Sequence, residues 1–194
     1  MNEKKILMII GPNGAGKTTI SYEMLMNGPK IYEFLNADEI ARGLAPIQPE
    51  KVPLEASKIM VRRLQHLLVA SENIAFESTG AGINYVKYIK QAQALGYEIN
   101  LIFLYLKSPD QAIKRVMQRV SQGGHDIPSS TIVRRFYSGV KNAISVYLPL
   151  SDKAIILDNS GEDFKVIARK MKGKQVDILE KTTWDQLEIL VYGR

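Results

Sequence analysis

The sequence predicts an α/β fold of three layers, in which helices cover both faces of a mostly parallel five-stranded sheet. Along most of the chain, short continuous apolar runs alternate with longer runs whose apolar residues recur at helical spacing. This alternation is typical of parallel strands joined by crossover helices. After Asn159 the rhythm changes, and two short apolar runs flank a turn at 172–174. A C-terminal β-hairpin is therefore expected to follow the sheet.

Short apolar runs are expected to form the parallel strands, and they cover residues 5–10, 30–36, 73–78, 97–106 and 153–159. Amphipathic runs are expected to form the main helices, and they cover residues 17–28, 53–71, 83–96, 108–122 and 129–148. Gly28 is expected to end the first helix, whereas Ser108 followed by Pro109 is typical of a helix start. A short helix at 184–190 is expected to complete the fold.

Length and composition bound the class of protein. A chain of 194 residues that is 45% hydrophobic can bury one good core. We expect a domain over residues 1–160 with a lid around 115–135, and a hairpin and short helix over 161–194 packed on the same domain. The absence of cysteine excludes disulfides, thiolate catalysis and cysteine-ligated zinc. No apolar run is long enough for a signal peptide or a membrane span, so a cytoplasmic protein with no membrane partner is expected.

The charge balance indicates an anionic ligand. The formal net charge is +6, from 26 Lys and Arg against 20 Asp and Glu. The basic residues are spread along the chain rather than gathered in one tail, so a nucleotide or a nucleotide sugar accounts for them as well as nucleic acid does. Nucleic acid is the less favoured partner.

The turn after the first strand fits the G-x-x-x-x-G-K-[ST] pattern of a phosphate-binding loop. Glycines allow backbone angles that aim successive N–H groups inward, and the helix that follows adds its positive dipole end. Lys17 is expected to reach the outer phosphates of ATP, and the Thr18 hydroxyl to ligate Mg²⁺. A P-loop NTPase-type fold is therefore predicted, with these nucleotide-binding residues: Gly11, Pro12, Asn13, Gly14, Ala15, Gly16, Lys17, Thr18 and Thr19.

P-loop proteins divide into switches, motors and kinases, and two of these classes lack support. A switch GTPase needs an N-K-x-D segment that reads guanine, and the sequence contains none. A motor usually has a longer chain and an acidic pair that closes an apolar strand, whereas residues 74–78 offer one carboxylate. A small-molecule kinase needs a carboxylate base, an acceptor site and mobile arginines, and candidates for all three are present.

Two strand ends carry candidate acceptor residues. Asp38 follows the second strand, where it either accepts the proton of an acceptor hydroxyl or caps the helix predicted at 39–44. Glu77 and Thr79 end the third strand, where they either bind sugar hydroxyls or a Mg²⁺-bound water, or form an ordinary polar turn. The residues alone leave both pairs of readings open.

Four arginines flank a glycine-rich segment and predict a lid. Arg115 and Arg119 are four residues apart and share one helix face, whereas Arg134 and Arg135 begin the following helix. Basic helix ends beside a flexible loop can close over ATP and exclude water. The alternative is a solvated basic face. His125 in the loop is expected to have a local hydrogen-bonding role.

Taken together, the segments GPNGAGKTT, NADEIARGL, FESTG, RVMQRVSQGGHDIP, IVRRF and ILDNS resemble the zeta toxin family of P-loop kinases, in the same order. The resemblance runs from about residue 4 to residue 160. It implies that Asp38 is the general base, that Glu77 and Thr79 hold the acceptor, and that Lys17 and Thr18 hold the phosphates and the metal. It also implies that Arg119, together with Arg134 or Arg135, contacts the transferring phosphoryl group. Asp158 and Asn159 would form part of the wall of the nucleotide pocket.

Zeta-type kinases phosphorylate a sugar hydroxyl of UDP-N-acetylglucosamine with ATP and Mg²⁺. The resemblance therefore implies an ATP-dependent kinase of a nucleotide sugar, with an antitoxin-type protein as a possible inhibitor. Zeta toxins have more acceptor-binding structure than 194 residues allow, so other acceptors stay open: a nucleoside, an antibiotic or an RNA end. A second alternative is a nucleotide-dependent module that binds nucleic acid or protein without phosphoryl transfer.

Overall fold

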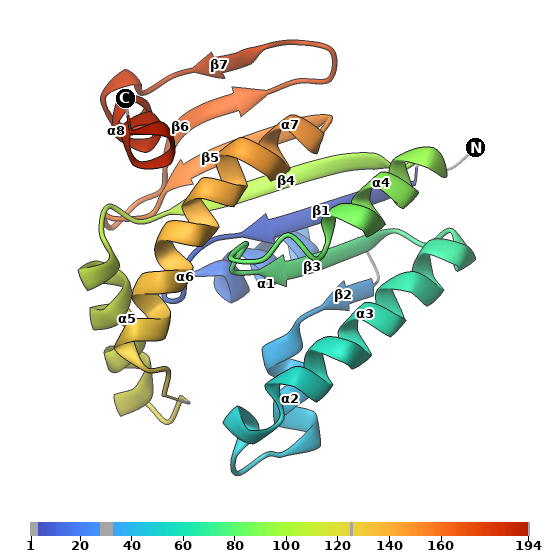
Figure 1. The fold of residues 1–194 in the computed structure, drawn as a ribbon, viewed down its shortest axis with the longest axis vertical. Helices are drawn as coiled ribbons and strands as arrows, with labels where there is room; N and C mark the ends of the chain where they lie inside the picture. The colour runs from blue at the N-terminus through green and yellow to red at the C-terminus, as the bar shows by residue number, and fades with distance from the viewer. Residues whose placement is uncertain (1–3, 28–32, 125, 194) are drawn as a thin grey trace.

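A seven-stranded sheet in the order β2-β3-β1-β4-β5-β6-β7 forms the centre of the molecule (Figure 1). The computed structural model describes residues 4–27, 33–124 and 126–193. The strands are β1 (Lys5–Ile10), β2 (Glu33–Leu35), β3 (Ile74–Ser78), β4 (Glu98–Tyr105), β5 (Lys153–Asp158), β6 (Lys165–Lys170) and β7 (Val176–Ile178). The first five are parallel, and β6 and β7 join antiparallel beyond β5. The predicted parallel sheet and C-terminal hairpin are thereby confirmed.

Helices pack on both faces of this sheet, as predicted. In Figure 1, α4 and α6 lie in front of the strands and α1 lies behind them. The helices are α1 (Lys17–Asn27), α2 (Ala37–Leu44), α3 (Pro53–Ala70), α4 (Val86–Ala94), α5 (Pro109–Ser121), α6 (Ser129–Asn142), α7 (Leu148–Leu150) and α8 (Lys181–Tyr192), with a 3-10 turn η1 (Pro49–Lys51) and a π-helical segment η2 (Ala143–Tyr147). The part of the chain that the structure describes contains no helix long and apolar enough to cross a membrane.

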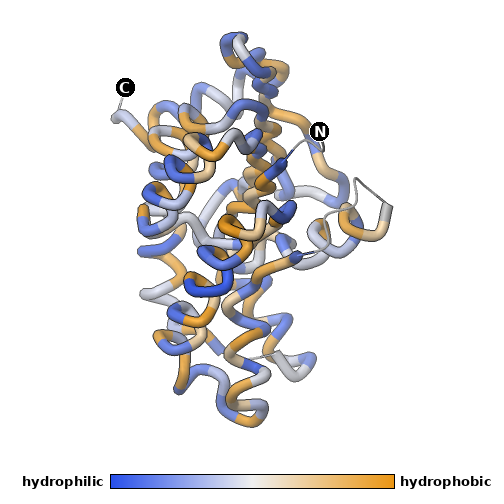
Figure 2. The backbone as a smooth tube through the Cα atoms, turned by 90° about the vertical axis from the view of Figure 1, so that its right-hand side faces the viewer, coloured by the Kyte–Doolittle hydropathy of each residue, from blue (hydrophilic) through white to orange (hydrophobic). Residues whose placement is uncertain are grey.

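The core lies between the sheet and its covering helices. Strands β1 and β4 are almost wholly buried, because a central parallel strand is covered on both faces. Figure 2 shows hydrophobic and hydrophilic residues alternating along the helices, as expected of amphipathic helices on a buried sheet. The continuous apolar runs that predict strands are therefore explained by burial on both sides.

The strand order places the turn after β1 at the carboxyl end of the sheet. Strand β1 lies between β3 and β4, and the Gly11 N–H donates to the carbonyl of Ser78 at the end of β3, at 3.2 Å. In a parallel sheet, the crevice beyond the carboxyl ends of the strands is where ligands bind. The phosphate loop, residues 11–18, is therefore held among the ends of neighbouring strands.

Several elements differ by a few residues from their predicted bounds, and the structure gives further detail for three of them. Helix α2 begins at Ala37 rather than at Glu39, because Asn36 caps it. The long helix predicted at 129–148 passes through the π-helical segment η2 before α7. Helix α8 begins at Lys181, three residues before the predicted start, because the Glu180 side chain accepts a hydrogen bond from Thr183 N–H at 2.7 Å.

The end of the first helix at Gly28 and the start of the second strand at 30–32 lie outside the described residues. Beyond β5, the C-terminal elements continue the same sheet. Strand β6 pairs with β5, and α8 packs against β6 and α6.

Candidate active site

The phosphate loop has the backbone geometry that its glycines predict. Gly14 and Gly16 adopt positive φ angles of 76° and 82°, which glycine populates without a side-chain clash. Lys17 Nζ folds back and donates to the carbonyl of Pro12 at 3.0 Å. Asn13 Oδ1 is buried and has no hydrogen-bond partner among the described residues. The loop therefore presents N–H groups, a lysine and an unpaired amide oxygen to one space.

Asn159, the residue after β5, holds this loop by a hydrogen bond. Its Nδ2 donates to the carbonyl of Ala15 at 2.9 Å and would lie 2.9 Å from a Cβ on Gly16. Asp158, the last residue of β5, accepts a hydrogen bond from Ser160 N–H at 2.8 Å and does not line the cavity described below. The two residues predicted to form the wall of the nucleotide pocket therefore have different partners: Asn159 contacts the phosphate loop, and Asp158 contacts Ser160.

Thr18, Ser21 and Glu77 form a hydrogen-bonded group beside the loop. Thr18 Oγ1 donates to Glu77 Oε2 at 3.1 Å, and Ser21 Oγ donates to Glu77 Oε1 at 2.8 Å. Among the described residues, no group of three or more His, Cys, Asp or Glu could hold a metal by itself. A hydroxyl next to one carboxylate fits Mg²⁺ instead, since this ion keeps several waters and binds through one or two protein oxygens plus substrate phosphates.

Asn36 joins this group to helix α2. Its Oδ1 accepts the N–H groups of Asp38 at 2.8 Å and Glu39 at 3.4 Å, and its Nδ2 donates to Glu77 Oε2 at 3.1 Å. The reading of Asp38 as the helix cap is therefore wrong, because Asn36 occupies that position. The Asp38 carboxylate is left to face the cavity, in the first turn of a helix that begins at a strand end.

Burial shifts the pKa values of the two charged groups at the centre of the site. Desolvation lowers the pKa of Lys17 below the usual 10.5, although Glu77 and Asp38 oppose the shift. Desolvation likewise raises the pKa of Glu77 above the usual 4.5, against Lys17 and the hydrogen bonds from Ser21 and Thr18. Shifts of this kind in a cleft are typical of functional sites.

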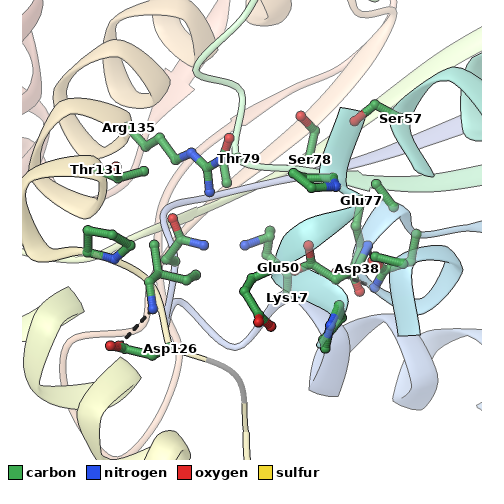
Figure 3. Close-up of a pocket in the computed structure, with 18 of the residues that line it drawn as sticks. Lys17, Asp38, Glu50, Ser57, Glu77, Ser78, Thr79, Asp126, Thr131 and Arg135 are labelled. Carbon is green, nitrogen blue, oxygen red and sulfur yellow. Dashed lines mark hydrogen bonds between the residues drawn. The ribbon is translucent and has the colours of Figure 1, made fainter. Parts of the chain in front are cut away.

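These groups open into a cavity of about 400 Å³. Figure 3 shows Arg135 reaching in from α6, while Lys17, Asp38 and Glu50 lie on the other side. The lining brings together residues from the phosphate loop, α2, η1, α3, the end of β3 and the start of α6: Asn13, Lys17, Asn36, Asp38, Glu50, Ser57, Glu77, Thr79, Tyr85, Asp126, Thr131 and Arg135 among others. A cavity of this size at the strand ends fits a small-molecule site.

The four lid arginines do not share one environment. Arg135 lines the cavity, and both Arg135 and Arg119 contribute to lowering the pKa of Lys17. Arg115 packs against the phosphate loop, where a Cβ on Gly14 would stand 3.0 Å from its own Cβ. Arg134 is exposed and does not line the cavity. His125 lies outside the described residues.

Thr79 lies in the turn between β3 and α4, and α6 packs tightly on this turn. A Cβ on Gly139 would collide with the Thr79 carbonyl, and Asn142 Nδ2 donates to the Gly80 carbonyl at 2.9 Å. The Thr79 hydroxyl accepts a hydrogen bond from Ala81 N–H at 3.4 Å. Thr79 therefore lines the cavity from a position that α6 holds. Thr19, by contrast, is exposed at the start of α1.

Several residues of the site are not identified from the sequence. Ser21, Asn36 and Tyr85 belong to elements that the sequence predicts, but the sequence analysis assigns no role to these three side chains. A hydrophilic residue in the second turn of α1 was the available signal for Ser21, and an Asn before an acidic first turn was the signal for Asn36. Glu50 and Asp126 come from connecting segments, whose place in space the sequence pattern does not give.

Comparison with known families matches residues 6–135 to the model of a family described as an AAA domain. An uncharacterized protein of Haemophilus influenzae is 22% identical over 134 residues, which cover 69% of this chain and 94% of that protein. The family match covers β1 to the start of α6, and so includes the phosphate loop and every cavity residue named above.

Solved structures with the same fold include toxin–antitoxin and kinase proteins. A structure of the AvrRxo1-ORF1:AvrRxo1-ORF2 complex with sulphate ions matches with a TM-score of 0.77 at 16% identity, over 95% of this chain and 63% of that one. The chain thus spans less than two thirds of that protein. The PezAT toxin–antitoxin system of Streptococcus pneumoniae matches at 0.69 and 16%, over 100% and 80%.

A gluconokinase from Sinorhizobium meliloti matches with a TM-score of 0.51 at 13% identity, over 83% of this chain and 86% of that one. The complex of AvrRxo1-ORF1 and -ORF2 also has a structure with ATP, which matches at 0.75. The resemblance to zeta toxin kinases is confirmed at the level of the fold, and the fold is that of P-loop kinases.

Proposed function

The chain belongs to the AAA domain family, whose model matches residues 6–135, and from this premise we propose that it is an ATP-dependent kinase of a small-molecule hydroxyl. One observation carries the proposal. A single cavity is lined by Lys17 of the phosphate loop, by the carboxylate of Asp38 and by Arg135 of α6. The Asp38 carboxylate is available because Asn36 caps α2 in its place. These are the three kinds of group that phosphoryl transfer needs: a phosphate clamp, a base and a mobile cation.

In the proposed reaction, the acceptor hydroxyl attacks the γ-phosphorus of ATP while the bond to the β-phosphate oxygen breaks. The hydroxyl proton passes to Asp38, and ADP leaves. Lys17, Arg119 and Arg135 offset the negative charge on the transferring group, and the loop N–H groups hold the outer phosphates. Catalysis then comes mainly from position and charge, as in other phosphoryl transfers.

Thr18 and Glu77 are the residues that would hold Mg²⁺, with Thr18 as a direct ligand and Glu77 acting through water. When bound, the ion would offset the negative charge of the phosphates. The hydrogen bonds from Ser21 and Asn36 orient the Glu77 carboxylate toward Thr18. We therefore move Glu77 from the acceptor side, where the sequence resemblance had put it, to the metal side.

The sequence resemblance implies a nucleotide sugar of the UDP-N-acetylglucosamine kind as one candidate acceptor, to be tested beside unphosphorylated sugars. The match of fold to a toxin–antitoxin system supports a second proposal, that a protein inhibitor binds this chain. Both proposals go beyond the P-loop kinase fold itself.

The test is ATP consumption with a panel of sugars, nucleotide sugars, nucleosides and antibiotics, read together with the mass of the acceptor. A kinase adds 80 Da, the mass of one phosphoryl group, to one class of acceptor. Asp38→Asn is expected to lower the rate by about 10²- to 10⁴-fold, the usual range for a positioned base, while ATP still binds.

Glu39→Gln is the matched control, because Glu39 lies in the same helix turn and pairs with Arg42 at 3.0 Å on the surface. If no acceptor gains mass, or if Asp38→Asn and Glu39→Gln behave alike, the proposal is wrong. A protein that binds a partner in an ATP-dependent way without phosphoryl transfer would then be the better account.

A further inference from the structure

The cavity has more carboxylates than cations on its lining. The charged groups among its described lining residues are two cations and four carboxylates: Lys17, Arg135, Asp38, Glu50, Glu77 and Asp126. The protein as a whole is basic, with a formal net charge of +6. The acidic character is therefore local to this site and runs against the balance of the chain.

In the proposed reaction, half of these charges serve ATP and its metal. Lys17 belongs to the phosphate loop, and Arg135 points into the cavity toward it (Figure 3). Glu77 accepts hydrogen bonds from Thr18, Ser21 and Asn36, so both of its oxygens are occupied. Within the described lining, the acceptor side is left with carboxylates and no cation.

Glu50 and Asp126 stand at the edge of the cavity on different walls. Glu50 lies in η1, between α2 and α3, whereas Asp126 precedes α6. Both residues are exposed, and neither forms an ion pair within the described parts of the chain. Asp126 Oδ1 accepts from Ile127 N–H at 2.7 Å, which leaves its second oxygen available to a ligand.

Part of the remaining wall is apolar and suits a ring. Pro49, Pro53 and Tyr85 line the cavity, and the Tyr85 ring is held against Phe76 at a centroid distance of 4.9 Å. A fixed aromatic face next to carboxylates can pack on the C–H face of a sugar while the carboxylates accept hydrogen bonds from its hydroxyls.

We infer that the acceptor is a polyhydroxyl compound that carries no phosphate of its own, and that Glu50 and Asp126 favour one with a positively charged amino group. The inference rests on the proposed function, because it names the class of its acceptor. A phosphate on the acceptor would lie among carboxylates and beside the phosphates of ATP, and the described lining has no further cation to offset it. Hydroxyls and an ammonium group instead donate to Asp38, Glu50 and Asp126.

A series of compounds that share one sugar ring tests the inference. We would measure the binding of glucosamine, N-acetylglucosamine, N-acetylglucosamine 1-phosphate and UDP-N-acetylglucosamine by calorimetry, with ADP and Mg²⁺ present. Affinity is expected to fall in that order, with glucosamine about tenfold tighter than the 1-phosphate. The inference is overturned if either phosphorylated compound binds more tightly, or if neither unphosphorylated compound binds.

Calorimetry measures binding, and the mass of the sugar measures phosphoryl transfer. The proposed kinase activity and the proposed acceptor class can therefore be contradicted independently. Glucosamine that binds in the expected order but gains no phosphoryl group from ATP would contradict the kinase and keep the acceptor class. Transfer to UDP-N-acetylglucosamine in preference to the unphosphorylated sugars would keep the kinase and contradict the acceptor class.

The double variant Glu50→Gln, Asp126→Asn links the preference to these residues. It is expected to weaken glucosamine about tenfold and to leave N-acetylglucosamine within about twofold. Glu55→Gln is the matched control, since Glu55 is exposed at the start of α3 and does not line the cavity. An unchanged ratio between the two sugars in the double variant would overturn the role of Glu50 and Asp126.

Discussion

Asn36 Nδ2 donates a hydrogen bond to Glu77 Oε2 at 3.1 Å, between two side chains that are both 7% exposed. The other atom of the same amide, Oδ1, accepts the N–H of Asp38 at 2.8 Å. One side chain therefore sets both the start of α2, which carries the proposed base, and the orientation of the carboxylate beside Thr18.

Replacing this amide by a carboxylate should move the pH dependence of the enzyme. Asn36→Asp keeps a good helix cap but places a second carboxylate against Glu77, which raises the pKa of Glu77 further. The acid limb of the kcat/KM profile is expected to move to higher pH. Asn36→Ser is the control, because it caps the helix without a charge. Equal profiles for the two variants would contradict the role of the hydrogen bond.

The wild-type profile itself is expected to be narrow. Burial raises the pKa of Glu77 above 4.5 and lowers the pKa of Lys17 below 10.5. On the acid side, activity should therefore fall as Glu77 gains a proton, and this happens at a higher pH than for an ordinary glutamate. On the alkaline side, activity should fall as Lys17 loses its proton, and this happens at a lower pH than for an ordinary lysine. A kcat/KM titration measures both limbs, and the acid limb of the residual activity of Glu77→Gln should differ from that of the wild type.

The raised pKa of Glu77 also makes the stability of the fold depend on pH. The folded protein binds a proton at Glu77 more readily than the unfolded chain does, so this group favours folding at low pH and loses that contribution as pH rises through its raised pKa. Without ATP, the free energy of unfolding of the wild type should change with pH in this window relative to Glu77→Gln. Urea titrations at several pH values measure the difference, and parallel curves would contradict it.

The two adjacent lid arginines should differ in their effect on turnover. Arg135 lines the cavity, whereas Arg134 is exposed and does not. Arg135→Ala removes a cation that offsets charge on the transferring phosphoryl group, so it should lower kcat about 10²-fold. Arg134→Ala should lower kcat less than about tenfold. Steady-state kinetics with the true acceptor decide, and the reverse order would show that α6 turns its other face to ATP.

Two helical glycines should respond in opposite directions to alanine. A Cβ on Gly139 would collide with the carbonyl of Thr79, whereas a Cβ on Gly43 meets nothing within 4 Å. Gly139→Ala should lower the free energy of unfolding by about 1–3 kcal/mol, and Gly43→Ala should raise it by about 0.5–1 kcal/mol. Denaturant titrations measure both, and similar values would mean that α6 does not pack on the Thr79 turn this closely.

The strands and the phosphate loop could be predicted because their signals are local. The apolar run of β1, the glycines of the loop and the helical spacing of α1 are all read within about 20 residues. The C-terminal hairpin was predicted for the same reason, since a turn lies between two short apolar runs. Local patterns therefore gave the elements, and the alternation of elements gave the parallel sheet.

The site was harder to predict, because its contacts join distant parts of the chain. Asn36 and Glu77 are 41 residues apart, and nothing in either segment indicates the other. The sequence left Asp38 as either cap or base, and only the hydrogen bonds of Asn36 decide which residue caps α2. Glu50 and Asp126 lie in connecting segments, whose position depends on how α2, α3, α5 and α6 pack.

The hydrogen bond from Asn159 to the Ala15 carbonyl spans 144 residues, and it orders events during synthesis. The phosphate loop leaves the ribosome before β5 does, but it acquires this contact only after β5 has been made and has joined β4. A nascent chain that ends before residue 159 carries the whole loop sequence without the amide that holds it. Tight nucleotide binding should therefore arise only after β5 has been synthesised and has joined the sheet.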